Sequence, residues 1–118
     1  MREMYKAMKL LYGRGLAKKT ALITDGRFSG TNNGCFVGHV SPEAAEGGPI
    51  AIIEDGDAIT IDVPNRALHL DVSDTEIAAR LARWKRPAPR IQRGYLALYA
   101  RLAASANRGA IIEHRFQD

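Results

Sequence analysis

The sequence predicts a small α+β domain in which short strands close into a barrel-like sheet with flanking helices. Three observations lead to this prediction. The chain has 118 residues, of which 46% are hydrophobic and 25% charged, the balance of a globular domain rather than of a disordered chain. Apolar segments with helical and with strand periodicity alternate in the order α–β–loop–α–βββ–α–α. Turn residues separate these segments. We therefore expect one domain, residues 1–118, with a substantial apolar core.

The first element is a helix that ends near Gly13. Met1, Met4 and Met8 recur at helical spacing, which indicates that they face the core. A glycine just past the last apolar turn is a usual C-terminal helix signal. A short apolar run at residues 20–24 follows, and its boundaries are typical of a buried strand.

Residues 25–34 are the most unusual stretch. Three glycines at four-residue intervals, with Asn and Asp between them, argue against a helix or strand. A loop directly after a buried strand is where α/β-type proteins place binding groups. Ser29 in this loop invites a hydrolase interpretation with His39 and Asp25, but its G-x-x-S-G setting departs from the nucleophile elbow. The loop also lacks the Lys-Ser/Thr pair of a P-loop, which leaves an anion-binding nest or a plain turn.

The middle of the chain is predicted to be β-structure. Residues 35–37 resume an apolar run, and residues 41–43 carry the Ser-Pro-Glu signature of a helix start. Two strands at 50–53 and 59–63 flank an Asp-Gly turn, which is a strong hairpin signal. A third strand is expected at 68–72, where apolar and polar residues alternate.

Two helices are predicted after the strands. Ser73 and Glu76 form a capping box that opens the first of them. Helical spacing places Trp84 on the same face as Ile77, so Trp84 is expected in the core rather than stacked on a nucleic-acid base. The last helix covers about residues 93–106. Four of its side chains are expected to be buried: Tyr95, Leu96, Tyr99 and Leu102.

Charge is unevenly distributed along the chain. The net charge of +4 is composed of +5 in residues 1–20, −8 in residues 41–78 and +7 in residues 79–118, with residues 21–40 neutral. Basic ends around an acidic middle can neutralise each other within one fold, and this is the interpretation we favour. The alternative is a basic face for phosphates or for nucleic acid, whose binding would fall steeply with salt.

Several classes of protein are excluded. Cys35 is the one cysteine, so an internal disulfide and a structural zinc site are ruled out, and we expect it to be a small buried apolar side chain. No apolar run approaches the ~20 residues that cross a bilayer, and the N-terminus lacks a signal-like apolar core. We expect a soluble cytoplasmic protein that binds neither membrane nor nucleic acid.

Strings of residues along nearly the whole chain, in order, match one known family. They are Met1-Arg2-Glu3-Met4, Thr24-Asp25-Gly26-Arg27-Phe28-Ser29-Gly30, Val37-Gly38-His39-Val40-Ser41-Pro42-Glu43-Ala44, Gly47-Gly48-Pro49-Ile50, Asp55-Gly56-Asp57 and Ser105-Ala106-Asn107-Arg108-Gly109-Ala110. In these strings the chain resembles the C-terminal domain of the dihydroxy-acid dehydratase and 6-phosphogluconate dehydratase family, which also contains sugar-acid dehydratases.

The resemblance implies a fold and a reaction. It implies a barrel-containing β/β/α domain of the swivelling type that packs over a larger N-terminal domain, absent from this chain. That larger domain would carry an iron–sulfur cluster, a carboxylated lysine and most ligands of a magnesium ion. The reaction would be loss of water from a 2,3-dihydroxy acid, giving a 2-keto acid through an enol. The cluster iron would act on the departing hydroxyl, and a serine alkoxide would take the C2 proton.

The resemblance also implies roles for single residues. Ser29 matches the proposed catalytic base, and Glu3 matches a magnesium ligand, for which a carboxylate is the right kind of donor. Thr31 and Gly30 match positions near the substrate. By itself the 118-residue chain would fold, hold no cofactor and be inactive. The complete enzyme would be a homo-oligomer.

The substrate is expected to be a dihydroxy acid of branched-chain amino-acid biosynthesis. A sugar acid is the alternative, because residues 31–33 replace a glycine common in branched-chain members of the family. A second alternative is a stand-alone binding module that has the same fold and performs no chemistry.

Overall fold

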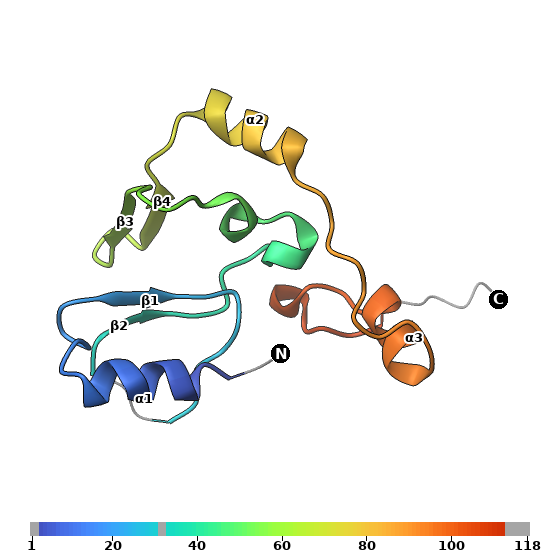
Figure 1. The fold of residues 1–118 in the computed structure, drawn as a ribbon, viewed down its shortest axis with the longest axis horizontal. Coiled ribbons are helices and arrows are strands. Elements are labelled where there is room, and N and C mark those ends of the chain that lie inside the picture. Colours follow the sequence, from blue (N-terminus) through green and yellow to red (C-terminus); the bar gives the residue numbers. More distant parts are fainter. Residues whose placement is uncertain (1–2, 31–32, 113–118) are drawn as a thin grey trace.

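The computed structural model describes residues 3–30 and 33–112 (Figure 1). Within them the chain forms α-helices, short strands and single turns of 3₁₀-helix. The helices and strands are α1 (Tyr5–Gly13), β1 (Ala21–Ile23), β2 (Cys35–Val37), β3 (Ile59–Asp62), β4 (Ala67–Leu70), α2 (Asp74–Arg83) and α3 (Tyr95–Leu102). The 3₁₀ turns are η1 (Ala44–Glu46), η2 (Pro49–Ile52) and η3 (Ala106–Arg108). The predicted α+β class is therefore confirmed.

The strands pair in two separate sheets. β1 and β2 run parallel, with Ala21 opposite Cys35. β3 and β4 run antiparallel, with Ile59 opposite Leu70. In Figure 1, α1 lies along one side of the β1–β2 pair, while β3, β4 and α2 lie on the other. Each sheet has two strands in the described part of the chain, so the expected closed barrel is not seen there.

The hairpin is formed by β3 and β4, with its turn at residues 63–66 rather than at the predicted Asp-Gly turn. Asn65 donates from its backbone N–H to Asp62 Oδ1 at 3.1 Å and from its side-chain amide to Asp62 Oδ2 at 2.7 Å. Arg66 adopts the left-handed conformation, with φ of 54°, and donates to the Val63 carbonyl at 3.1 Å. This Asx-type turn reverses the chain between β3 and β4.

The prediction of a strand at residues 50–53 is wrong. Pro49 opens the 3₁₀ turn η2 there, and the fixed φ of proline suits the first position of a helical turn. A Cβ on Gly48 would lie 1.7 Å from the Pro42 carbonyl oxygen, so the backbone passes too close to residue 42 for any other residue. The Asp-Gly turn then connects η2 to β3, with Glu54 N–H bonded to Asp57 Oδ2 at 2.8 Å.

The predicted helices are present with different ends. Ser73 caps α2 by accepting the Glu76 N–H at 3.2 Å, as the capping box predicts. The helix predicted to begin at residues 41–43 is reduced to the 3₁₀ turn η1. The last helix is eight residues long, because Gly94 has a φ of 77° before it and Ala103 is extended after it.

Burial on α3 differs from the prediction. Tyr95, Leu96 and Leu102 are 71%, 58% and 47% exposed, so the expectation that they are buried is wrong. Tyr99 is half-buried, and its hydroxyl donates to the Ala110 carbonyl at 2.6 Å. The apolar face of α3 therefore has little to pack against in this chain.

The apolar core is thin. Of the residues that the structure describes, only Met8, Ala17 and Ile52 are both apolar and buried. The chain exposes 9,499 Å², against about 6,300 Å² for a compact protein of 12.9 kDa. Its radius of gyration is 16.8 Å, whereas a compact domain of this length has about 13.5 Å. The prediction of a substantial apolar core is therefore wrong. The prediction that Cys35 is buried is also wrong, because Cys35 is exposed.

The predicted burial of the methionines and of Trp84 is confirmed in part. Met8 is 1% exposed and Met4 half-buried, while Met1 lies outside the described residues. Trp84 is half-buried and approaches the backbone at Gly47, whose Cβ would lie 3.2 Å from the Trp84 ring. Among residues 3–30 and 33–112, no helix has the length and apolar character that crossing a membrane requires.

Candidate functional site

The start of the loop after β1 is fixed by hydrogen bonds to the segment after β2. Thr24 is buried; its N–H donates to the Val37 carbonyl at 2.9 Å, and its carbonyl accepts from Val40 at 3.2 Å. The Thr24 hydroxyl accepts the Gly26 N–H at 2.9 Å, and the Gly26 carbonyl accepts from His39 at 2.9 Å. These bonds extend the β1–β2 pairing into the loop and set where it leaves the sheet.

The Phe28 ring anchors the middle of this loop. It packs against Phe36 of β2, with ring centroids 5.4 Å apart. A Cβ on Gly38 would lie 3.1 Å from the Phe28 ring, so this packing depends on glycine at residue 38. Because Phe28 turns toward the sheet, the next residue, Ser29, is half-buried and Gly30 is exposed.

Glu3 is attached to the same loop. Its backbone forms a parallel β-bridge with Arg27, and Met4 N–H donates to the Arg27 carbonyl at 2.8 Å. The Glu3 carboxylate lies 3.7 Å from the Arg27 guanidinium, and both side chains are about half exposed. Arg27 precedes Ser29 by two residues, so the structure brings Glu3 and the Ser29 loop to one corner of the molecule.

Gly30, one of the two predicted substrate contacts, lies in the described part of the loop. Gly30 has a φ of 84°, in the left-handed region that favours glycine. A Cβ there would lie 3.9 Å from the Tyr5 ring, so the loop passes beside the start of α1. Thr31 lies outside the described residues.

The side chains present fit one of the two implied cofactors in part. Within the described ranges, no three His, Cys, Asp or Glu side chains gather around a point that could hold a metal. Glu3 offers one exposed carboxylate, the kind of hard oxygen donor that magnesium takes, and the other ligands would come from elsewhere. A cluster needs several thiolates. Cys35 is the chain's only cysteine, so these residues do not fit a cluster.

Asp25 has a structural partner. Its Oδ2 accepts the backbone N–H of Ala44 at 2.8 Å, at the start of η1. His39 is exposed and adopts a φ of 56°, uncommon for a residue with a Cβ. The bond from Asp25 to Ala44 shows that this carboxylate holds η1 rather than orienting an imidazole.

Glu43 joins two distant parts of the chain, a contact that the sequence analysis missed. The Ser105 hydroxyl donates to Glu43 Oε2 at 2.6 Å, and the Ala106 N–H donates to Oε1 at 2.8 Å. These two bonds hold the pKa of the Glu43 carboxyl below its ordinary value. Both partners lie within strings that carry the family resemblance, which was the available signal.

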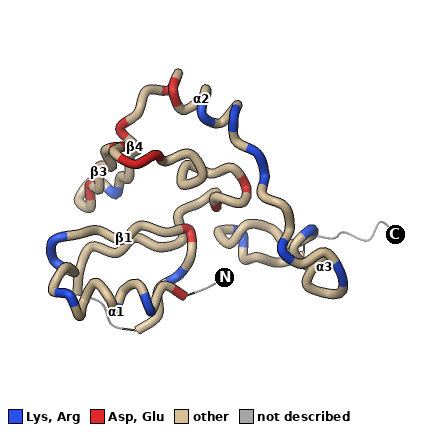
Figure 2. Tube along the Cα trace, viewed as in Figure 1, with Lys and Arg blue, Asp and Glu red and all other residues tan. Residues whose placement is uncertain are grey.

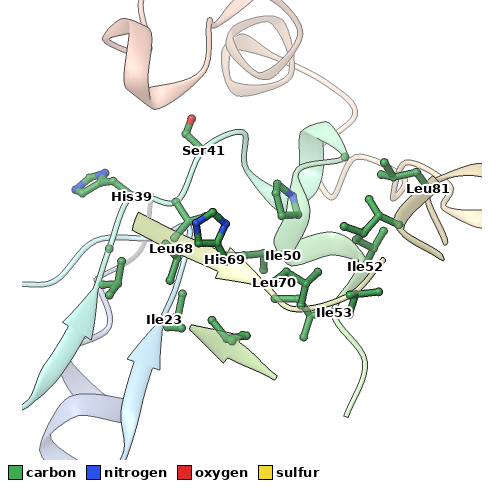
Figure 3. A pocket seen from close by; sticks show the side chains of 18 of the residues that line it. Ile23, His39, Ser41, Ile50, Ile52, Ile53, Leu68, His69, Leu70 and Leu81 are labelled. Atoms are coloured by element: carbon green, nitrogen blue, oxygen red, sulfur yellow. The ribbon is translucent and has the colours of Figure 1, made fainter. Parts of the chain in front are cut away.

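A cavity of about 670 Å³ lies between the two sheets (Figure 3). Ile23 and Val37 line it from β1 and β2, and Ile59, Leu68 and Leu70 line it from β3 and β4. The polar residues of its lining include His39 and Ser41, on the segment after β2, and His69 of β4. No pattern in the sequence predicts this cavity.

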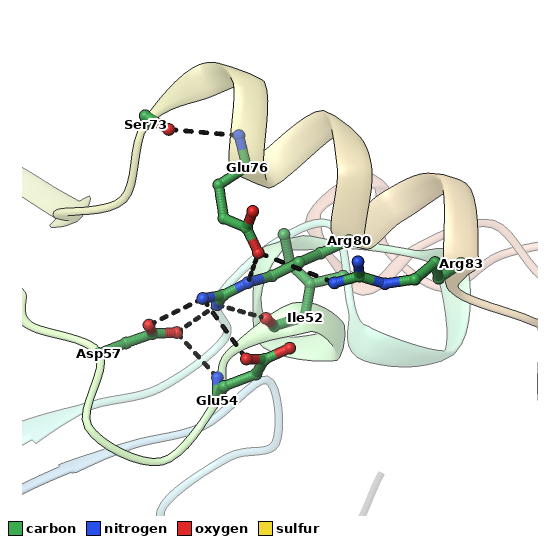
Figure 4. Close-up of polar contacts among 7 residues, drawn as sticks. All are labelled: Ile52, Glu54, Asp57, Ser73, Glu76, Arg80 and Arg83. Atoms are coloured by element: carbon green, nitrogen blue, oxygen red, sulfur yellow. Dashed lines mark hydrogen bonds and ion pairs between the residues drawn. The ribbon is translucent and has the colours of Figure 1, made fainter.

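A cluster of charges holds α2 against the segment before β3 (Figure 4). Arg80 donates to both carboxylate oxygens of Asp57, at 2.5 and 3.1 Å, and to Glu76 Oε1 at 2.9 Å. It also donates to the Ile52 carbonyl at 3.1 Å and lies 3.6 Å from Glu54. These contacts raise the pKa of Arg80 and lower that of Asp57. The cluster joins the acidic middle of the chain to its basic third (Figure 2).

Comparisons with known proteins agree with the sequence strings. The model of the family "Dihydroxy-acid/6-phosphogluconate dehydratase C-terminal" matches residues 1–110. The chain is 56% identical over 115 residues to the dihydroxy-acid dehydratase of Acetivibrio thermocellus, covering 98% of this chain and 21% of that protein. It is 57% identical over 111 residues to that of Caldanaerobacter subterraneus subsp. tengcongensis, covering 94% and 20%.

A third relative is similar to the chain to the same degree. The dihydroxy-acid dehydratase of Methylococcus capsulatus is 55% identical over 113 residues, which are 96% of this chain and 20% of that protein. The chain thus spans about one fifth of the length of these relatives. The predicted family is confirmed: the chain belongs to the dihydroxy-acid/6-phosphogluconate dehydratase C-terminal family.

Proposed function

We propose that this chain supplies the Ser29 loop to a dihydroxy-acid dehydratase, a lyase that converts 2,3-dihydroxy acids to 2-keto acids. The relatives that share more than half of its residues bear that name. The observation that carries the proposal is the corner where the Glu3–Arg27 bridge meets the Ser29 loop. Branched-chain amino-acid biosynthesis is the proposed context and the cytoplasm the proposed location.

Ser29 is the proposed catalytic base. As an alkoxide its oxygen takes the proton from C2 of the substrate, and the C2–H electron pair forms the C2–C3 double bond. The 3-hydroxyl leaves and, with a proton, becomes water; the enol then tautomerises to the keto acid. The hydrogen bonds at Thr24 and Gly26 hold the start of the loop in place, and positioning of the base is what such a proton transfer requires.

Glu3 and the residues after Ser29 have supporting roles in this proposal. A bound magnesium ion would supply positive charge that favours the serine alkoxide and the developing enolate. Glu3 would contribute one of its ligands from the exposed side of the Arg27 bridge. Gly30 is exposed and has no side chain, which leaves room for the substrate. Thr31 is proposed as a further substrate contact.

The rest of the enzyme belongs to a larger part that this chain does not include. We assign to it the iron–sulfur cluster, the remaining magnesium ligands and the homo-oligomeric contacts. The swivelling-type barrel is likewise proposed for the complete protein. Cys35 is given no part in the cluster, because it is a single exposed cysteine at the start of β2.

A chimaera tests the role of Ser29. In it, residues 1–118 replace the matching segment of the Acetivibrio thermocellus dehydratase. We expect Ser29→Ala to lower kcat by about 10²–10⁴-fold without changing cluster content or melting temperature. Ser73→Ala is the matched control: it removes the α2 cap and is expected to lower stability slightly while kcat stays within about twofold. A near-normal kcat for Ser29→Ala contradicts the assignment.

The same chimaera separates the alternatives. A higher kcat/KM for 2,3-dihydroxyisovalerate than for gluconate supports the branched-chain substrate, and the reverse supports a sugar acid. A chimaera that folds and loads its cluster but converts neither acid supports a binding module without chemistry.

A further inference from the structure

An Asn-Gly pair, Asn33-Gly34, directly precedes β2. Both residues are exposed, and neither lies in a helix or a strand. Among the described residues, neither the Asn33 side chain nor the Gly34 N–H has a hydrogen-bond partner. The proposed dehydration gives this pair no part, so its chemistry is a separate property of the chain.

The side-chain amide of such a pair is open to attack from the main chain. The Gly34 nitrogen loses its proton and attacks Asn33 Cγ, and glycine has no Cβ to obstruct the approach. A C–N bond forms, and the side-chain nitrogen leaves as ammonia, which produces a cyclic imide. Water then opens the ring at either carbonyl, returns a proton to the Gly34 nitrogen and leaves a carboxylate. One opening gives aspartate; the other gives isoaspartate, whose main chain is longer by a CH2 group.

The glycine of this pair is required by the packing of the chain. A Cβ on Gly34 would lie 2.2 Å from the carbonyl oxygen of Ala17 and 3.1 Å from its carbonyl carbon. These are backbone atoms, so no larger residue fits at this position without moving the segment after α1. Asn33 is therefore followed by glycine for a structural reason, and the reactive pair is a consequence of the fold.

The other two asparagines in the described residues are in less reactive settings. Asn65 and Asn107 are each followed by an arginine, whose side chain obstructs the attacking nitrogen. The backbone N–H of each arginine also donates to a carbonyl, at 3.1 Å after Asn65 and at 2.9 Å after Asn107. The side-chain amide of Asn65 donates to Asp62 Oδ2 at 2.7 Å. Asn33 thus combines an unobstructed attacking nitrogen with an unpaired amide, in contrast to both.

We propose that Asn33 is a site of spontaneous deamidation and that its isoaspartate form loosens the start of β2. The contact between Gly34 and Ala17 leaves no space for a longer main chain. Gly34 directly precedes Cys35, which pairs with Ala21 of β1, so a displacement at Gly34 is passed to this pairing. The reaction consumes water and releases ammonia, and it uses no residue of the proposed catalytic site.

Ageing of the chimaera tests the site. The folded protein is incubated in mildly alkaline buffer, and peptide mapping by mass spectrometry measures conversion of each asparagine to the acid. We expect Asn33 to convert at least about tenfold faster than Asn65 and Asn107, because glycine leaves the attacking nitrogen unobstructed. Methyl transfer from S-adenosylmethionine by an isoaspartate methyltransferase detects the isoaspartate form. The 118-residue chain unfolded in urea is the reference. If Asn33 converts in urea but stays intact in the folded chimaera, the proposal is overturned.

Two substitutions separate the reaction from its effect on β2. Asn33→Gln keeps an amide on a longer side chain that closes a ring less readily, so conversion at this position should disappear. Asn33→Asp carries the new charge on a main chain of normal length. We expect amide hydrogen exchange in β1 and β2 to be at least about fivefold faster in aged protein than in fresh Asn33→Asp protein. Equal exchange in the two samples contradicts the effect on β2. Neither measurement depends on catalysis, so a failure of Ser29 as the base would leave both unchanged.

Discussion

The Ser29 loop and the region around Arg80 are held in place by different kinds of contact. The loop is fixed by main-chain hydrogen bonds at Thr24 and Gly26 and by close approach of glycines to their neighbours. The Arg80 region is fixed by charged side chains that reach across from α2. The structure of the Ser29 loop therefore depends on the small volume of its glycines, and that of the Arg80 region depends on the ionisation of its side chains and on salt concentration. A loop held by its backbone keeps its shape while its side chains are free to change.

The largest expected loss of stability comes from a steric clash in the loop region. A Cβ at Gly34 would lie 2.2 Å from the Ala17 carbonyl oxygen, and a backbone atom cannot move aside cheaply. We expect Gly34→Ala in the chimaera to lower the free energy of unfolding by about 3 kcal/mol, measured by denaturant titration. Gly13→Ala is the control, because no atom lies within 4 Å of its added Cβ. Equal effects of the two substitutions would contradict the steric account.

A smaller effect is expected from the Arg80 region. Arg80→Met removes the paired bonds to Asp57, and both side chains are 11% exposed. We expect a fall in melting temperature of roughly 2–4 °C in 50 mM salt, and a smaller fall in 1 M salt, where charges are screened. Arg83→Met is the control, since Arg83 is 67% exposed and contacts Glu76 at 3.7 Å. A salt-independent loss would show that packing rather than charge holds α2.

The smallest effect depends on pH. Hydrogen bonds from Ser105 and Ala106 lower the pKa of Glu43 below 4.5, so its ionised form stabilises the fold above that pH. This contribution disappears as the pH falls through the lowered pKa. We expect Glu43→Gln to melt roughly 2 °C lower at pH 7, with the difference vanishing at strongly acidic pH. Glu46→Gln, which loses an exposed pair with Arg86, should show little difference at any pH.

Local signals in the sequence predicted local structure well. The Ser73–Glu76 capping box opens α2 because its hydrogen bond joins residues three apart. The strings of residues predicted the family because they are spread in order along residues 1–110, the segment that the family model matches. The described part of the glycine-rich stretch is a loop, and the backbone bridge between Glu3 and Arg27 brings Glu3 beside it.

Long-range features were not predictable in the same way. Residues 50–53 have the apolar content of a strand, but a strand needs a partner, and Pro49 with Gly48 leads the chain into a 3₁₀ turn instead. Tyr95 and Leu96 have the spacing of a buried face, but burial depends on a second surface that the pattern of one helix does not reveal. The cavity depends on how two sheets face each other, which no single segment encodes. The roles of Ser29, Glu3, Gly30 and Thr31 stay predictions.

The contact between Glu43 and Ala106 has a consequence for the order of folding. It joins residues 63 apart, whereas the β3–β4 hairpin closes over a four-residue turn. Loop closure over longer separations costs more chain entropy and is slower, while hairpins form in about 1–10 μs. The hairpin should therefore form early, and the C-terminal segment should join last and detach first. Partial unfolding would then release η3 and α3 while the Ser29 loop keeps its backbone bonds.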